Sequence, residues 1–560
     1  MNAVFLVLAG AVAMTFGYFV YSRFIAERIL RLDPEFRTPA HELEDGIDYV
    51  PTNRFVLWGH HFTSVAGAAP IIGPAIAVIW GWLPATLWVI FGTIFFAGIH
   101  DFAAIWASVR NKGRSIGALT ADVVGSRARS VFMIVIFLLL LMVNAVFAVA
   151  IAGLFTSFPS SVFPAWSAII VAVIIGYLLY RRGVGLLWPS LIGVAVLYLT
   201  VYLGSSVPIT LSDGTFGLPS NAQWILLLFA YAGIASLLPV WLLLQPRDYI
   251  NGLQLFVGLG VVYGAVLVLQ PEVVAPAIND NLPAGTPPLL PLLFVTIACG
   301  AISGFHGLVS SGTTSKQLNK ETDARFVGYF GAIGEGSLAL AAIIVTTAGF
   351  ATLADWEAVY TAFGQGSLNA FVNGGASIVH NGLGLPLEFA ITLLTVMAVL
   401  FAGTTMDTGV RLQRYIIQEW GNIYGVALLR DNLIATFLAV GACLALAFGA
   451  GGLSGAGGLA IWPLFGTTNQ LLAGLTLMVV TVMLVKLGRP VWYTILPMCF
   501  LLTMTVLALL IQLWGFWEQG RYFLVALDLV ILVAAILVIL EALAAFNRER
   551  RAAAAAVAAE

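Results

Sequence analysis

The chain has 560 residues, of which 60% are hydrophobic and only 9% are charged. A soluble domain needs far more charged surface than this, so the composition excludes a soluble globular protein and predicts an all-α polytopic membrane protein. The formal net charge is −2 and no basic face is visible, so we expect no nucleic-acid partner. Cys299, Cys443 and Cys499 all lie in apolar stretches, which is typical of packing residues rather than of a disulfide or a metal set.

Apolar runs that are long enough to cross a bilayer recur along the whole chain. A span needs about 20 apolar residues, and shorter runs are accepted where turn residues bound both ends. No basic residues precede the first apolar run, as they would in a signal peptide, so we interpret this run as a retained span and not as a cleaved signal. This pattern predicts about 15 transmembrane helices, at 2–22, 57–79, 82–108, 130–156, 164–180, 184–204, 222–244, 252–269, 291–314, 326–350, 386–410, 432–450, 458–485, 491–515 and 522–545.

Lys and Arg residues indicate on which side of the membrane each connection lies. The connections 205–221, 270–290 and 351–385 contain no Lys or Arg. The positive-inside rule therefore predicts an outside N-terminus and an inside C-terminus, with Arg521 as the one clear exception. The basic residues on the predicted inside are Arg23, Arg28, Arg31 and Arg37 after the first span, Arg110, Lys112, Arg114, Arg127 and Arg129 after the third, Arg181 and Arg182 after the fifth, Arg247 after the seventh, Lys316, Lys320 and Arg325 after the ninth, Arg411, Arg414 and Arg430 after the eleventh, Lys486 and Arg489 after the thirteenth, and Arg548, Arg550 and Arg551 after the last.

One short pattern occurs twice. Residues 59–67 and 304–312 both have the form G-x-H-x5-G, each in an apolar segment interrupted by glycine and hydroxyl residues. Three matched positions can coincide by chance in a chain with 57 glycines. In the predicted topology, however, the two segments cross the membrane in opposite directions, seven spans apart, so we expect an inverted pseudo-twofold between the halves. Paired interrupted segments of this kind are typical of secondary transporters, whose substrate lies between them near the bilayer midplane.

The interrupted segments predict the chemistry of the substrate. A broken helix in lipid survives only where protein, water or a ligand completes its hydrogen bonds, and half-helix N-termini suit an anion such as a carboxylate. Two further breaks, at 403–408 and 466–470, add hydroxyl and amide groups that could line the same cavity. The candidate substrate-binding residues are His60, His61, Ser64, Gly67, His306, Ser310, Ser311, Thr313, Thr314, Thr405, Asn469 and Gln470.

Ionisable residues at membrane depth are costly, which makes each a functional candidate. Histidines and buried carboxylates can take up a proton on one side of the membrane and release it on the other. For His100, Asp101 and Asp407 the alternative is a structural role near a helix end, with Asp407 paired to Arg411 or Arg414. The candidate proton-coupling residues are His61, His100, Asp101, His306, Glu335 and Asp407.

Several long stretches of the chain resemble the carbon starvation (CstA) family of bacterial transporters. The resemblance covers most of residues 50–490, and its blocks stand in the family's order. These blocks are 58–67 (W-G-H-H-F-T-S-V-A-G) with Pro70, Gly73 and Pro74, 98–102 (G-I-H-D-F), 244–249 (L-Q-P-R-D-Y), 305–314 (F-H-G-L-V-S-S-G-T-T), 404–409 (T-T-M-D-T-G) and 462–470 (W-P-L-F-G-T-T-N-Q).

The resemblance implies a function and a fold. The family includes pyruvate/proton symporters and members associated with peptide uptake, which implies inward transport of pyruvate, or alternatively a peptide or amino acid, across the bacterial inner membrane. It also implies a LeuT-like (APC superfamily) fold with extra helices, in which alternating access moves the substrate. The expected organisation is an extra N-terminal transmembrane helix (1–25), a cytoplasmic loop (26–56), a transporter core with inverted repeats (57–490), C-terminal transmembrane helices (491–547) and a cytoplasmic tail (548–560).

The chain also departs from the family pattern. Ser315 stands where the family commonly has proline, and the chain is shorter than the long members, so a different choice of substrate stays open. The seven-span offset between the breaks exceeds the five of a LeuT repeat. Two inserted spans, at 222–244 and 252–269, would reconcile the two numbers, and a 7+7 inverted-repeat fold is the alternative.

A second functional class stays open. Histidines 60, 61, 100 and 306 with Asp101 offer ligands suited to a transition metal, so a metal transporter or a metal-dependent membrane protein is the alternative. The sequence contains neither H-E-x-x-H nor G-x-S-x-G, so we expect no catalytic residues, no enzyme activity and no cofactor.

Overall fold

The computed structural model describes residues 1–46, 48–185, 187–239, 241–449, 452–453 and 460–559. Within these ranges the chain forms helices, connecting loops and two isolated β-bridges. The other positions lie outside the described residues, and they include single positions of the predicted loop 26–56, of the predicted spans 184–204, 222–244 and 432–450, and of the tail 548–560, as well as residues 458–459 of the predicted span 458–485.

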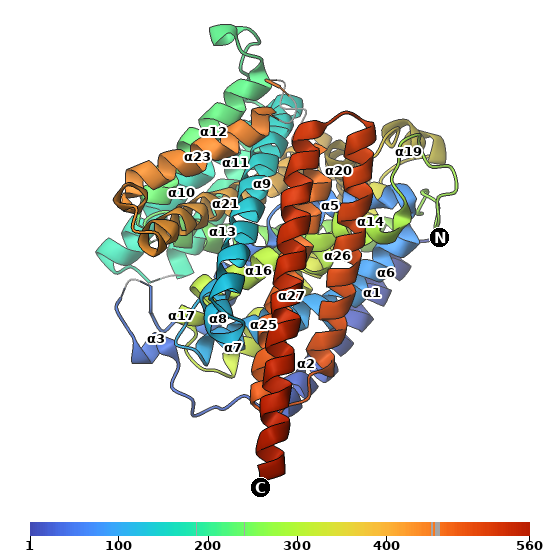
Figure 1. Ribbon diagram of the computed structural model, residues 1–560. Coiled ribbons are helices and arrows are strands. Elements are labelled where there is room, and N and C mark those ends of the chain that lie inside the picture. Colours follow the sequence, from blue (N-terminus) through green and yellow to red (C-terminus); the bar gives the residue numbers. More distant parts are fainter. Residues whose placement is uncertain (47, 186, 240, 450–451, 454–459, 560) are drawn as a thin grey trace.

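Helices account for the membrane-spanning part because only a helix satisfies its own backbone in lipid. Thirteen helices of the described residues are long and apolar enough to cross a membrane. They are α1 (Val4–Phe16) continuing into α2 (Ser22–Phe24), α6 (Trp82–Gly92) continuing into α7 (Gly98–Val109), α9 (Ser126–Ser157), α10 (Val162–Arg182), α11 (Leu187–Gly204), α12 (Ser220–Leu237), α13 (Leu244–Leu269), α18 (Phe330–Ala348), α21 (Leu387–Ile423), α23 (Asn432–Gly449), α25 (Trp462–Lys486), α26 (Trp492–Glu518) and α27 (Tyr522–Ala559) (Figure 1).

Two further segments are interrupted, and they are the two that the repeated pattern marks. The first consists of α4 (Arg54–Ala66) and α5 (Ala69–Ala77), which are bent by 45° at Gly67. The second is divided into α14 (Leu289–Thr296), α15 (Ala298–Ala301), α16 (Gly304–Val309) and α17 (Ser315–Gln317), with extended backbone at Ile302 and Ser303. The predicted interruption of both segments is therefore confirmed. The two further breaks predicted at 403–408 and 466–470 are wrong, because α21 and α25 run through these positions as continuous helices. With the bent pair α4 and α5 counted as one span, the described residues give up to 14 candidate spans, one fewer than the number predicted.

The two interrupted segments run antiparallel. The Thr52 amide before α4 donates to the Gln317 carbonyl at the end of α17, at 3.0 Å. At the other end, the Trp80 indole beyond α5 donates to the Pro287 carbonyl before α14, also at 3.0 Å. The segments thus cross the bundle in opposite directions, as the predicted topology requires. A pseudo-twofold between whole halves, and with it the choice between the LeuT-like and 7+7 folds, stays a prediction.

The break in the second segment is held by Asn469 of α25. Its Oδ1 atom accepts a hydrogen bond from the Phe305 amide at 3.0 Å and lies 3.1 Å from the Ser303 hydroxyl. Its Nδ2 atom donates to the Cys299 sulfur at 2.9 Å. All of these groups are buried, so Asn469 supplies hydrogen bonds that lipid could not.

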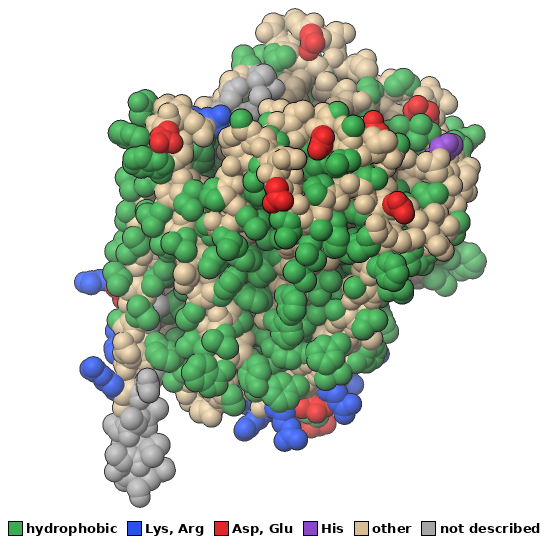
Figure 2. All heavy atoms as spheres, turned by 90° about the vertical axis from the view of Figure 1, so that its right-hand side faces the viewer, with side chains coloured by type: hydrophobic (Ala, Val, Ile, Leu, Met, Phe, Trp, Pro, Cys, Tyr) green, Lys and Arg blue, Asp and Glu red, His purple; other side chains and the backbone are tan. Residues whose placement is uncertain are grey.

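The bundle has an inner layer and a lipid-facing layer. In the most apolar stretch of α21 and of α25, 89% of the residues are buried, against 22% in the first span. Figure 2 shows a belt of hydrophobic side chains, with Lys and Arg gathered at one end and most of the visible Asp and Glu at the other. We call the end with Lys and Arg the basic face. The opposite end is the N-terminal face, where the Ala3 amide bonds to the Pro271 carbonyl.

Two helices lie where the sequence indicates only a connection. The segment 351–385 contains α19 (Leu353–Val359) and the longer α20 (Ser367–Leu383). Along its length α20 touches the backbone of α18 at Val345 and that of α13 at Ala265, both close to the N-terminal face. It therefore lies along that face instead of crossing the bundle, and the chain before and after it stays on one side. The interpretation of this segment as a simple loop is wrong. The helix was missed because its 17 residues, three of them glycine, are too few and not apolar enough to be recognised as a membrane span.

Some basic residues placed in connections belong to helices. Arg247 lies in the first turn of α13 and is 4% exposed, because this helix begins at Leu244 and not at 252. Arg411 and Arg414 lie within α21, which continues to Ile423, and both are buried. The predicted loop positions of these three residues are therefore wrong.

At the basic face, the connection 31–53 crosses the end of the second interrupted segment; we call it the strap. It includes the short helix α3 (Pro39–Glu42). The Asp33 amide donates to Glu321 at 2.6 Å, and the same carboxylate binds the Arg110 guanidinium. The His41 ring lies 2.8 Å from the Asn319 amide oxygen. The fully buried Glu321 carboxylate thus fastens the strap to the end of α7.

We expect Asn469→Ala to destabilise the protein by about 1 to 2 kcal/mol, the usual effect of removing a helix-capping acceptor. The measurement is the thermal unfolding temperature of the purified protein in detergent. Thr468→Ala is the matched control, because that hydroxyl donates only to the Leu464 carbonyl of its own helix. Equal unfolding temperatures for the two variants would contradict the capping role of Asn469.

We expect Glu321→Ala to release the strap, because it removes the acceptor shared by Arg110 and the Asp33 amide. The expected loss of stability is about 2 kcal/mol, as for hydrogen bonds to a charged group. Limited proteolysis of the strap measures the release, with the exposed Glu44→Ala as the control. An unchanged cleavage rate in Glu321→Ala would show that other contacts hold the strap.

Candidate functional site

The two interrupted segments touch each other through His61. Its Nδ1 atom lies 2.9 Å from the Thr314 hydroxyl oxygen, and both residues are buried. The ring packs against α18 at Gly331, where a Cβ atom would stand 2.9 Å from the imidazole. Its Nε2 atom is buried and has no hydrogen-bond partner among the described residues. One candidate from each segment is thus brought together, and one imidazole nitrogen is left to meet a ligand.

Four of the candidate proton-coupling residues form a continuous chain, which we call the ionisable chain. His100 Nδ1 lies 2.7 Å from Asp101 Oδ1, and Asp101 Oδ2 lies 2.9 Å from His306 Nδ1. His306 Nε2 lies 3.0 Å from Glu335 Oε2. At most 1% of any of these residues is exposed. They come from α7, α16 and α18, and Glu335 stands one helical turn from Gly331 and hence close to His61.

The charge balance of the ionisable chain depends on protons. An unpaired charge at membrane depth costs about 3 kcal/mol or more, so the two carboxylates need positive partners inside the bundle. His306 lies between both carboxylates and neutralises one of them when it is protonated. One further proton, on Glu335, would bring the net charge of the chain to zero.

A neighbouring face of α4 carries a second polar contact. His60 Nδ1 lies 3.0 Å from Asp248 Oδ2, and the Ser64 hydroxyl donates to the same oxygen at 3.0 Å. Asp248 belongs to α13 and is fully buried. Its other oxygen, Oδ1, has no hydrogen-bond partner among the described residues. His60 and His61 thus point to different neighbours, α13 and the second interrupted segment.

The bend at Gly67 faces a free hydroxyl. Gly67 has φ of +41°, a conformation that favours glycine. A Cβ atom there would also stand 2.7 Å from the Thr405 hydroxyl of α21. That hydroxyl is buried and makes no hydrogen bond within the described part of the chain. Gly67 and Thr405, both predicted to bind substrate, therefore adjoin each other at the first break.

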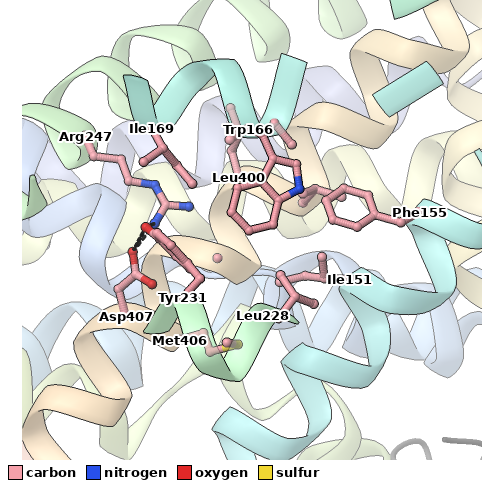
Figure 3. Close-up of a pocket in the computed structure, with 13 residues that line it drawn as sticks. Ile151, Phe155, Trp166, Ile169, Leu228, Tyr231, Arg247, Leu400, Met406 and Asp407 are labelled. Atoms are coloured by element: carbon pink, nitrogen blue, oxygen red, sulfur yellow. Dashed lines mark hydrogen bonds and ion pairs between the residues drawn. The ribbon is translucent and has the colours of Figure 1, made fainter. Parts of the chain in front are cut away.

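Asp407 lies apart from the ionisable chain. It forms an ion pair with Arg247, and the Tyr231 hydroxyl donates to the same carboxylate oxygen at 2.7 Å (Figure 3). The alternative pairing with Arg411 or Arg414 is wrong. The Arg411 guanidinium donates to the Ala235 and Leu238 carbonyls at the end of α12, and the Arg414 guanidinium lies over the Tyr415 ring, 4.9 Å from its centre. The structure connects Asp407 with α12 and α13 rather than with its own helix.

This ion pair borders a small cavity. The cavity measures about 20 Å³, which is room for about one water molecule. Apart from Arg247, Asp407 and Tyr231, its walls are apolar, and Figure 3 shows Trp166 and Phe155 turned toward it. In this conformation it is too small for an organic substrate.

Some of the other candidate side chains already form hydrogen bonds within the protein. The Ser311 hydroxyl accepts from the Ile116 amide at 2.9 Å, at the start of α8 (Ile116–Val123). The Thr313 hydroxyl donates to the Val309 carbonyl at 3.0 Å. The Ser310 hydroxyl and the Gln470 Oε1 atom are buried without a partner among the described residues. Of this set, Ser310 and Gln470 keep atoms that a ligand could use.

Three residues at these contacts were not among the candidates: Tyr231, Arg247 and Asp248. Arg247 and Asp248 stand in the block 244–249, so the rule that ionisable residues at membrane depth are candidates would have found them. They were missed because the span boundary was placed at 252. No local signal marks Tyr231, whose partner Asp407 is 176 positions away.

The metal alternative gains no support from the described side chains. Among them, no group of three or more His, Cys, Asp or Glu residues is placed so that it could hold a metal ion.

Comparison with known proteins gives the family. The family model described as carbon starvation protein CstA matches residues 2–361 and 350–508. The peptide transporter CstA of Campylobacter jejuni is 34% identical over 564 residues, which cover 90% of this chain and 79% of that protein. The pyruvate/proton symporter BtsT of Escherichia coli is 32% identical over 594 residues, which cover 92% and 82%.

A solved structure, that of the Eremococcus coleocola manganese transporter, is similar with a TM-score of 0.46 and 15% identity, covering 90% of this chain and 99% of that one. The family expected from the sequence blocks is thus confirmed by matches that run almost from end to end: the chain is a multi-pass membrane protein and belongs to the carbon starvation protein CstA family.

Proposed function

We propose that this protein is a secondary active transporter that takes up a small carboxylate nutrient, most simply pyruvate, together with a proton. The observation that carries the proposal is the ionisable chain, which is buried next to the contact between the two interrupted segments. The name of the Escherichia coli relative, a pyruvate/proton symporter, supports both the substrate and the coupling ion. The basic face would lie in the cytoplasm, according to the positive-inside rule.

The proton would act on the ionisable chain. With His306 protonated and Glu335 charged, the chain carries one net negative charge inside the bundle. A proton from outside, taken up by Glu335, would remove this charge and with it the penalty for moving the segment through a medium of low dielectric constant. Release on the cytoplasmic side would restore the starting charge and complete the cycle.

The carboxylate would bind at the first break. The N-terminus of α5 offers the positive end of its dipole, which suits an anion, although Pro70 has no amide hydrogen and the Ile71 and Ile72 amides donate to the Ala68 carbonyl. The unpartnered Thr405 hydroxyl and His61 Nε2 could complete the hydrogen bonds. Because His61 also contacts Thr314 in the segment that carries His306, occupation of the first break and protonation of the ionisable chain would favour the same conformation.

Peptide uptake is the second candidate. The Campylobacter jejuni relative is named a peptide transporter. The same positive helix end would attract the C-terminal carboxylate of a peptide, so the two substrates require sites of different size but of the same charge. Competition by dialanine against labelled pyruvate separates them.

We expect proteoliposomes containing the native protein to accumulate labelled pyruvate when an inward proton gradient is imposed. His61→Ala and His306→Ala should each reduce the initial rate at least about tenfold, because each removes a charge-assisted hydrogen bond of the site. If the native protein transports dialanine but not pyruvate, the proposed substrate is a peptide instead of pyruvate. If the rate of uptake is the same with and without the proton gradient, transport is not coupled to protons.

We expect Glu335→Gln to separate substrate movement from proton movement. The amide cannot gain or lose a proton, so gradient-driven accumulation should be lost while exchange of internal for external pyruvate continues. Asp528→Asn is the matched control, since Asp528 is equally buried but belongs to α27, which carries no member of the ionisable chain. Normal accumulation by Glu335→Gln would show that the coupling proton binds elsewhere.

A further inference from the structure

A large cavity opens at the N-terminal face, away from the ionisable chain. It measures about 720 Å³ and lies between α14, the start of α25, the end of α26 and the connection before α20. We call it the vestibule. Its walls are largely apolar and include Leu292, Phe363, Trp514 and Phe516. This volume falls in the range of small-molecule sites, about 300 to 1,000 Å³.

A single cation lines the vestibule. Arg521 is the only Lys or Arg among its lining residues, and the connections 205–221, 270–290 and 351–385 of the same face contain none. The side chain is exposed, and none of the ion pairs found among the described residues includes it. Glu518, one turn earlier on α26, is exposed as well but does not line the cavity. The vestibule therefore presents one positive charge to solutes at a face otherwise poor in cations.

The floor of the vestibule leads to the second interrupted segment. Its lining includes Gln512, whose amide donates to the Pro463 carbonyl at 3.3 Å and accepts from the Thr467 hydroxyl at 3.0 Å. Thr467 is followed two positions later by Asn469, which holds the break. Pro463 and Asn469 are six positions apart on α25, a rise of about 9 Å. The cavity is thus separated from the break by less than two turns of one helix.

We propose that the vestibule is a capture site for the carboxylate group of the transported solute, with Arg521 as its anion-binding residue. The proposal rests on the proposed function for the identity of the solute, and it assigns a binding site distinct from the one at the breaks. The guanidinium pairs with a carboxylate through two parallel hydrogen bonds, and the aromatic walls cover the apolar part of the solute. The volume exceeds that of pyruvate, so the vestibule also accepts the C-terminal end of a short peptide.

Protection of an introduced cysteine tests binding without requiring transport. Gln519 lines the vestibule, and Gln519→Cys in a Cys499→Ser background places one reactive thiol there, since Cys299 and Cys443 are buried. We expect pyruvate or dialanine to slow labelling by a membrane-impermeant maleimide at least threefold, and uncharged methyl pyruvate to have no effect. Comparison of the protection by pyruvate with the protection by dialanine shows which of the two solutes the vestibule binds. Ser212→Cys, in an exposed connection of the same face, is the control whose labelling should not change.

Arg521 itself is tested by substitution. Arg521→Gln should raise the pyruvate or dialanine concentration needed for half-protection about tenfold, the effect of losing one charge-assisted hydrogen-bonded pair. Arg521→Lys should retain part of the affinity that Arg521→Gln loses. In proteoliposomes the same Arg521→Gln change should raise KM and leave the maximal rate unchanged, because the residue lies outside the coupling machinery.

The possible results separate the two proposals. Gradient-driven uptake without any protection by pyruvate or dialanine, or protection that survives Arg521→Gln unchanged, would overturn the vestibule site and leave the proposed function intact. Protection that depends on Arg521 in a protein that shows no proton-driven uptake would support the vestibule site and overturn the coupling.

Discussion

The structure depends on one constraint: an interruption of a helix inside a bilayer persists only where other groups replace its missing hydrogen bonds. Asn469 meets this constraint for the second segment by accepting from the Phe305 amide. With the backbone held there, α16 starts in a fixed direction, and its third residue, His306, lies between Asp101 and Glu335. The capping amide on α25 thus determines where the charged groups of three other helices meet.

The first interrupted segment organises a second set of contacts around α4. Adjacent residues on its surface serve different partners: His60 contacts Asp248 of α13, and His61 contacts Thr314 of the second segment. Neighbours on a helix point about 100° apart, so one helix can join two polar clusters that do not share a residue. Movement of α4 would consequently change both clusters together.

Local sequence was enough to predict most of the spanning helices and the interruptions of the two segments that carry the repeated pattern, because apolar runs, glycines and hydroxyl residues act on the backbone where they stand. The same signals wrongly predicted breaks at 403–408 and 466–470, where α21 and α25 are continuous. It did not predict the partners of the charged groups. Asp407 pairs with Arg247, 160 positions away, and only packing brings the two together. Helix α20 was missed because it lies on a face instead of crossing the bundle, so hydropathy does not mark it. Ser311 was predicted to bind substrate from its place in a hydroxyl-rich run, but its hydroxyl also anchors the start of α8.

The strap has a mechanical consequence. The strap precedes α4 in the chain and leads directly into it. Through Thr52, His41 and Asp33 it is hydrogen-bonded to the residues at and just beyond the end of α17. The ends of both interrupted segments at the basic face are therefore joined into one body. In the proposed transport cycle, separation of these two ends would require the contacts of the strap to break. The far halves, α5 and α14, would therefore move about the breaks themselves while the joined ends stay together.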